Sequence, residues 1–193
     1  VQKYLSDNNN SMNPTMHGAM QNAINYFNEY AGIGREKKLL LFFKNSDVKK
    51  ILDLYNKRCK YFLKNAFPTS CCREFLVFIK KNFVHTNIYI LSGSESNEIE
   101  YFLSKNKINE FFSEIFCSEK SKLKHLLSMN LASNDLFIGD SKSDLQAAIK
   151  AKIDFILMEE YRSQNSYPFK LETDLIKIHR TRNFCTLIDT LNK

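Results

Sequence analysis

The stretch from residue 136 to residue 145, which reads Leu-Phe-Ile-Gly-Asp-Ser-Lys-Ser-Asp-Leu, most constrains how this chain can fold. Its apolar start followed by Gly139 predicts a buried strand that ends in a tight turn, with a helix beginning at about Ser143. Gly139 would permit a backbone conformation that a Cβ would resist. The next two carboxylates, Asp140 and Asp144, would then lie at the carboxyl end of the strand, where open α/β sheets bind ligands.

This carboxylate pair has two interpretations. Two aspartates that point into one crevice suit a hard cation such as Mg²⁺, which prefers oxygen ligands. An aspartate at this place can instead simply cap the following helix. The choice depends on what else the chain brings to the same edge of the sheet.

From residue 67 onward, predicted strands alternate with predicted helices. The expected strands are 87–91, 114–116, 136–138, 155–158 and 175–178, and the expected helices are 73–82, 95–106, 108–112, 122–129, 144–150 and 185–191. This alternation predicts an α/β fold, in which a parallel sheet carries helices on both faces. With only 5 glycines and 3 prolines, the chain is poorly suited to a turn-rich all-β fold.

Residues 1–66 are expected to form a separate helical unit in front of a core at 67–193. Apolar side chains recur at helical spacing over 22–30 and again over 47–62, where Ser46 is a plausible N-cap. The segment 38–43 is ambiguous between strand and helix. The polar stretch 7–11 predicts a break between helices.

Two further short segments follow predicted strands. Ser92, Gly93 and Ser94 come after strand 87–91, so a hydroxyl group and free backbone amides could cradle a phosphate there, although the segment could also be a plain turn. Lys122 comes after strand 114–116 and begins a helix, where its charge could neutralise a phosphate or a nucleophilic carboxylate. Lys120 and Lys124 are rivals for this role, and any one of the three could be a solvated surface residue.

Ser92, then Lys122, then Asp140 with Asp144 each follow a strand, and in this order and spacing residues 67–193 resemble the haloacid dehalogenase (HAD) superfamily of phosphohydrolases. The nearest likeness is to its phosphoglycolate-phosphatase-like branch. The resemblance implies a Rossmann-like parallel sheet, with residues 1–66 as a helical cap that covers the active site and selects the substrate. It also implies a Mg²⁺-dependent phosphatase that acts on a small phosphorylated metabolite such as a sugar phosphate.

By the same resemblance, each matching residue has an expected role. Ser92 with the amides of Gly93 and Ser94 would hold phosphate oxygens, and Lys122 would stabilise their charge. Asp140 would hold Mg²⁺, and Asp144 would be a second metal ligand or would orient the first. In the cap, the candidate substrate contacts are His17, Arg35 and Arg58.

The family's first motif, Asp-x-Asp-Gly, supplies the nucleophilic aspartate, and this sequence lacks it. One explanation is a decayed motif at 5–10, with Ser6 and Asn8 in place of the aspartates. The other, which we favour, is that the first strand lies before Val1, because 1–5 is too polar for a strand buried on both faces. In that case the chain alone would be inactive, and strands 87–91 and 136–138 would not be hydrogen-bonded to each other. The alternative function is a HAD-like pseudoenzyme that binds a phosphorylated ligand or a protein partner.

Composition narrows the partners and the compartment. The formal net charge of +7 comes from scattered basic residues without a long tract, so we expect no nucleic-acid partner. No apolar run approaches the roughly 20 residues of a membrane span, and no signal peptide opens the chain. Five cysteines without a framework, two of them adjacent at 71 and 72, predict reduced thiols and a cytoplasmic location. The expected partner is a small phosphorylated substrate, and the oligomeric state stays open.

Overall fold

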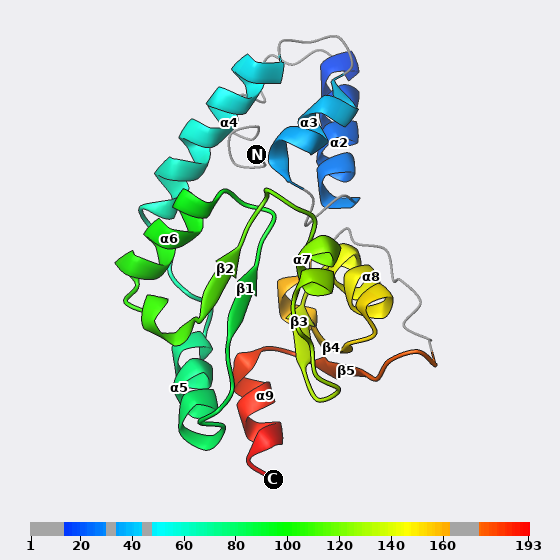
Figure 1. The fold of residues 1–193 in the computed structure, drawn as a ribbon. Helices are drawn as coiled ribbons and strands as arrows, with labels where there is room; N and C mark the ends of the chain where they lie inside the picture. Colours follow the sequence, from blue (N-terminus) through cyan, green and yellow to red (C-terminus); the bar gives the residue numbers. More distant parts are fainter. Residues whose placement is uncertain (1–13, 30–33, 44–47, 163–173) are drawn as a thin grey trace.

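The computed structural model describes residues 14–29, 34–43, 48–162 and 174–193, and Figure 1 shows their arrangement. In chain order the helices are α2 (Pro14–Glu29), α3 (Arg35–Phe42), α4 (Val48–Leu63), α5 (Cys72–Asn82), α6 (Ser96–Lys105), α7 (Lys122–Ser128), α8 (Lys142–Ala151) and α9 (Phe184–Leu191). The strands are β1 (Tyr89–Leu91), β2 (Glu114–Phe116), β3 (Leu136–Gly139), β4 (Asp154–Met158) and β5 (Ile178–Thr181). Two short 3-10 helices are η1 (Asn109–Phe111) and η2 (Glu159–Tyr161). The predicted α/β class is confirmed.

The described strands form two parallel sheets. One contains β1 and β2, and the other contains β3, β4 and β5 in that order. Figure 1 shows β1 and β3 as the facing strands of the two sheets. In the described part of the chain they are not hydrogen-bonded to each other. Residues 1–10, on which the decayed-motif explanation depends, lie outside the described residues.

Helices cover both faces of the larger sheet, as the side chains of β4 demonstrate. Successive residues of a strand point to opposite faces. Phe155 and Leu157 join a buried cluster with Leu126 of α7 and Leu145 of α8. Ile156 and Met158 join a second cluster with Phe75 of α5 and Leu187 of α9. The pair α7–α8 therefore lies on one face, and the pair α5–α9 lies on the other.

Helix α5 packs against both sheets. Phe75 belongs to the cluster under β4, while its neighbour Leu76 is buried with Leu103 and Ile108, against which Ile90 and Ile115 of the smaller sheet pack. On the opposite face Leu91, the last residue of β1, packs against the cluster that contains Phe137 of β3. Side-chain packing on both faces thus holds the two sheets together.

The described residues before position 64 form three helices, α2, α3 and α4, and contain no strand. The ambiguous segment 38–43 is mostly helical, since α3 extends to Phe42. An aromatic cluster joins the three helices, with Phe27 stacked on Tyr55 and Tyr26 packed against Phe42. The expected N-cap Ser46 and the polar break at 7–11 lie outside the described residues.

Three local predictions need correction. The last strand is Ile178–Thr181 and not 175–178. Just before the strand begins, the Lys177 amide donates to the Asp154 side chain, Oδ1, at 2.8 Å. The helix expected from Ser143 or Asp144 begins at Lys142 with Ser141 as its N-cap. The helix expected at 108–112 is the single 3-10 turn η1.

The prediction that all cysteines are reduced is wrong, because Cys71 and Cys185 form a disulfide between the starts of α5 and α9. They are 114 residues apart in sequence, so no local spacing pattern reveals the pairing. Cys59, Cys72 and Cys117 are free thiols. The sequence argument for a cytoplasmic location depended on reduced thiols and does not hold for this pair. Among the described helices, none is long and apolar enough to cross a membrane.

Candidate active site

The centre of the candidate site is the turn between β3 and α8. Ser141 and Asp144 form a reciprocal capping box, in which the Ser141 hydroxyl accepts from the Asp144 amide and Asp144 Oδ2 accepts from the Ser141 amide at 3.1 Å. The Ser141 hydroxyl also donates to Asp144 Oδ2 at 2.6 Å. A Cβ on Gly139 would lie 2.6 Å from the Asp144 Cβ. Glycine is therefore required for close approach and not, as expected, for an unusual backbone conformation.

Lys122 is bound to the other oxygen of the same carboxylate. Its Nζ lies 2.5 Å from Asp144 Oδ1, and the exposed fractions of the two side chains are 16% and 2%. Lys122 is the first residue of α7, whose N-cap is Ser121, and so the ion pair links the start of α7 to the start of α8. Lys120 and Lys124 are exposed. Of the three candidate lysines, Lys122 is the one that forms an ion pair with Asp144.

Asp140 lies beside this ion pair. Burial raises the pKa of the Asp140 carboxyl above its usual value, repulsion from Asp144 raises it further, and Lys122 partly offsets the rise. Both oxygens of Asp144 already accept hydrogen bonds, from Lys122 and from Ser141. Asp144 therefore fits an orienting role better than that of a metal ligand, which leaves Asp140 as the carboxylate that a cation would meet.

The Ser92–Ser94 segment forms a compact turn at the end of β1. The Ser92 amide donates to the Phe116 carbonyl at 2.8 Å, and the Ser94 amide donates to Ser92 Oγ at 3.1 Å. Within the described residues, Gly93 is therefore the position of this turn whose amide has no intramolecular acceptor. The Ser118 amide donates to the Ser94 carbonyl at 3.2 Å, and this bond joins the loops that follow β1 and β2. Within the described residues, no hydrogen bond or ion pair links Ser92 to Lys122, Asp140 or Asp144.

The helices before residue 64 reach these loops through α3. A Cβ on Gly34, the N-cap of α3, would lie 3.8 Å from Ser118 Cβ and 4.0 Å from the Gly93 carbonyl oxygen. The adjacent Arg35 forks onto Glu98 of α6, with N–O distances of 3.0 and 2.8 Å. The guanidinium group also donates to Asn56 of α4 at 2.6 Å and lies over the Tyr55 ring.

The other two predicted substrate contacts differ in position. Arg58 is exposed on α4. The side chain of His17 lies outside the described residues.

Sequence reasoning did not identify Ser141 or Glu98 as part of this region. Ser141 carries a recognisable signal, a serine three residues before an acidic residue at a helix start, whereas Glu98 is like any helical glutamate until the fold brings it to Arg35.

A magnesium ion is a partial fit to these side chains. In the described part of the chain, no group of three or more His, Cys, Asp or Glu residues converges on one point. Mg²⁺ retains several waters and is often held by one or two carboxylates. The half-buried Asp140, with its raised pKa, is a carboxylate whose charged form a cation would stabilise. The donor set thus suits a metal that takes its remaining ligands from water and substrate.

Comparisons with known proteins agree with this geometry. The family described as haloacid dehalogenase-like hydrolase matches residues 8–158. The structure is similar to that of YfnB from Bacillus subtilis, described as a HAD-hydrolase bound to magnesium, with a TM-score of 0.64 and 17% identity over 100% of this chain and 89% of that chain. It is also similar to a HAD-superfamily hydrolase of subfamily IA from Geobacter sulfurreducens, with a TM-score of 0.55 and 17% identity over 89% of this chain and 78% of that chain. No curated protein matches.

Proposed function

We propose, from the premise that this chain belongs to the haloacid dehalogenase-like hydrolase family, that the protein is a magnesium-dependent phosphatase. Its substrate would be a small phosphorylated metabolite such as a sugar phosphate. The observation that carries the proposal is the ion pair between half-buried Lys122 and buried Asp144, beside Asp140 at the carboxyl end of β3. A lysine and a free carboxylate at one point suit a phosphate and its metal counter-ion.

Each side chain then has a distinct task. The Ser92 hydroxyl, whose oxygen already accepts from Ser94, has its own proton available for a phosphate oxygen. The Gly93 amide would be a second donor to the phosphate. Lys122 would stabilise charge on the phosphate oxygens, and Asp144 would fix the position of Lys122. Asp140 would hold Mg²⁺, which when bound stabilises negative charge on a phosphate oxygen as a Lewis acid.

The expected nucleophile in this family is an aspartate of an Asp-x-Asp pair, and the 193 residues contain no such pair. Hydrolysis through a phospho-aspartate therefore needs a nucleophilic aspartate, and the first motif that would supply it is not present in these 193 residues. The same absence favours the second candidate, a protein that binds a phosphorylated ligand or a protein partner without hydrolysing it. Neither candidate requires nucleic acid or a membrane.

The position of α3 supports a cap role for residues 1–66, with 67–193 as the core. Gly34 lies close enough to the loops that follow β1 and β2 for an added Cβ to contact them, and the Arg35–Glu98 pair fixes that approach. A substrate bound at Gly93 would therefore lie next to the start of α3. We extend the proposal to substrate selection by this end of α3.

Hydrolysis of an aryl phosphate with and without Mg²⁺ tests the proposal. Two polypeptides are compared, the 193-residue chain and the product of the complete coding sequence. The phosphatase proposal expects Mg²⁺-dependent hydrolysis by the latter and its loss in Asp140→Asn, while Lys120→Ala retains activity. If neither polypeptide hydrolyses the ester but both bind inorganic phosphate, the result supports the second candidate, a protein that binds a phosphorylated ligand without hydrolysing it.

A further inference from the structure

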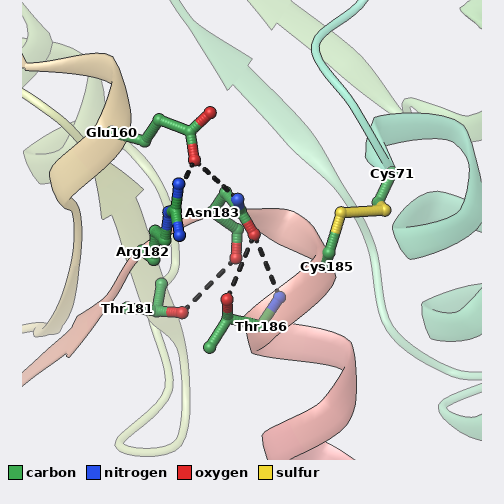
Figure 2. The surroundings of a disulfide bond; sticks show 7 residues. All are labelled: Cys71, Glu160, Thr181, Arg182, Asn183, Cys185 and Thr186. Atoms are coloured by element: carbon green, nitrogen blue, oxygen red, sulfur yellow. Dashed lines mark hydrogen bonds and ion pairs between the residues drawn. A yellow bond between two sulfur atoms is a disulfide. The ribbon is translucent and has the colours of Figure 1, made fainter.

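The Cys71–Cys185 disulfide lies on the face of the larger sheet opposite α7 and α8, and Figure 2 shows its surroundings. It joins α5, which packs against both sheets, to α9, which follows β5. Stacking of Phe75 on Phe184, with ring centroids 4.9 Å apart, supports the same contact. β1 and β3 share no hydrogen bond in the described residues, so this contact helps to hold α5, and with it the smaller sheet, against the larger sheet.

Interactions that do not involve sulfur hold the backbone of Cys185 in place. Asn183 caps α9 by accepting from the Thr186 amide at 3.0 Å and from the Thr186 hydroxyl at 3.2 Å. Asn183 Nδ2 in turn donates to Glu160 at 2.6 Å, next to the end of β4. Figure 2 shows this polar network beside the disulfide. The start of α9 would keep this position without the disulfide.

Cys71 lies at the start of α5. It is the N-cap of that helix, with φ of 58°, and its carbonyl accepts from the Phe75 amide at 2.9 Å. A left-handed conformation is uncommon for a residue with a Cβ and persists only where the surroundings determine it. The two Cα atoms are 5.2 Å apart. The Phe75–Phe184 stack links the same two helices without sulfur, so we expect the two thiols to stay close to each other after reduction.

The remaining cysteines are poor competitors for this pair. Burial raises the pKa of the thiols of Cys59, Cys72 and Cys117, which lowers their thiolate fraction. Cys72, although adjacent to Cys71, packs against the cluster of Leu76, Leu103 and Ile108. Cys71 and Cys185 are both half-buried and lie at helix N-termini, where the helix dipole favours a thiolate.

We propose that Cys71 and Cys185 form a reversible redox site that responds to small-molecule thiols and disulfides and sets the strength of the α5–α9 contact. One protein thiolate attacks a small-molecule disulfide, which forms a mixed disulfide and releases one thiol. The second protein thiolate then displaces the other small thiol and closes the Cys71–Cys185 bond. The protein loses two protons and two electrons, and the small disulfide is reduced to two thiols. This site does not depend on the proposed phosphatase activity.

The test uses the 193-residue chain equilibrated in buffers of reduced and oxidised glutathione. Alkylation in denaturant followed by mass spectrometry counts the free thiols, and calorimetry gives Tm. We expect two fewer alkylated cysteines in oxidising buffer, a peptide cross-link between 71 and 185, and a Tm about 5–15 °C higher than in reducing buffer. The change should reverse when the buffer is exchanged.

Two matched serine variants separate the pair from its neighbour. Cys185→Ser should have the same Tm in both buffers, close to that of the reduced chain, whereas Cys72→Ser should keep the full redox-dependent shift. Five alkylated cysteines in oxidising buffer would overturn the proposal. So would a Tm that is independent of the buffer, or a redox shift that is lost in Cys72→Ser.

Discussion

Two contacts near the junction of the two sheets, one on each face of the larger sheet, differ in chemistry. On one face, the site joint consists of the Lys122–Asp144 ion pair with Leu91 packed against the cluster of Phe137. On the other face, the cysteine joint consists of the Cys71–Cys185 disulfide and the Phe75–Phe184 stack. The site joint uses charges that a ligand could also engage, whereas the cysteine joint uses covalent and apolar contacts. The comparison indicates that the face with α7 and α8 carries the charged side chains of the candidate site, whereas the face with α5 and α9 carries the proposed redox site.

Breaking both joints together should have the largest effect. Reduced Asp144→Ala loses the ion pair, the capping box and the disulfide, each worth a sizeable part of the ~5–15 kcal/mol that stabilises a typical domain. We expect this variant to lose its cooperative unfolding transition in urea, as followed by circular dichroism. A cooperative transition close to that of the parent chain would show that the two contacts are not the principal connections.

Asp144→Ala alone, with the disulfide intact, should come next. Removal of Asp144 leaves the half-buried Lys122 with Asp140 as its nearest counter-charge and removes one half of the capping box of α8. We therefore expect a loss of about 2–3 kcal/mol in the free energy of unfolding, below the loss for a fully buried pair. Asp189→Ala, at an exposed position on α9, is the matched control and should change it by less than about 0.5 kcal/mol. Equal losses of stability in the two variants would contradict a stabilising role for the Lys122–Asp144 ion pair.

Phe184→Leu tests the apolar part of the cysteine joint. The variant keeps an apolar side chain but loses the ring stack on Phe75, so we expect a loss of about 0.5–1.5 kcal/mol in either redox state. Urea unfolding in reducing and in oxidising buffer measures it. If the loss appears only in reducing buffer, the stack and the disulfide are alternative supports and not parallel ones.

The smallest effect concerns Asp140 and pH. Because burial and Asp144 raise the pKa of Asp140 in the folded chain, its contribution to stability is full below the ordinary aspartate pKa and is lost as pH rises through the raised value. Asp140→Asn should therefore be more stable than the parent at neutral pH without Mg²⁺, and the difference should shrink toward acidic pH. Thermal unfolding across this pH range measures both. An Asp140→Asn variant that is less stable than the parent at neutral pH would contradict the raised pKa of Asp140.

The site joint could be predicted from the sequence better than the cysteine joint. Gly139, Asp140 and Asp144 lie within six consecutive residues, and Lys122 begins a helix after a strand, so local patterns place them at strand ends. Cys71 and Cys185 meet only because α5 and α9 pack on the same face of β4. The Arg35–Glu98 pair, likewise, joins helices 63 residues apart. Contacts of this kind depend on tertiary packing, which periodicity does not encode.

Strand boundaries illustrate the same limit. β4 is apolar and buried after Asp154, whereas β3 is apolar but buried only at Phe137, and both lie within one residue of their predicted bounds. The basic edge strand β5 begins three residues later than expected, since Leu175 is exposed and Ile176 is buried before the strand starts. The apolar residues at 175 and 176 therefore belong to the segment before the strand and do not define the strand itself.

The central claim is that the loop after β1 and the site joint form one phosphate-binding site. Titration of the isotope-labelled chain with inorganic phosphate in Mg²⁺, followed by the backbone amide signal of Gly93, tests it most directly. We predict a saturable shift that weakens tenfold or more in Lys122→Ala and is unchanged in Lys124→Ala, the exposed lysine two residues further along α7. A Gly93 signal that does not respond, or an equal loss in both lysine variants, would contradict the claim.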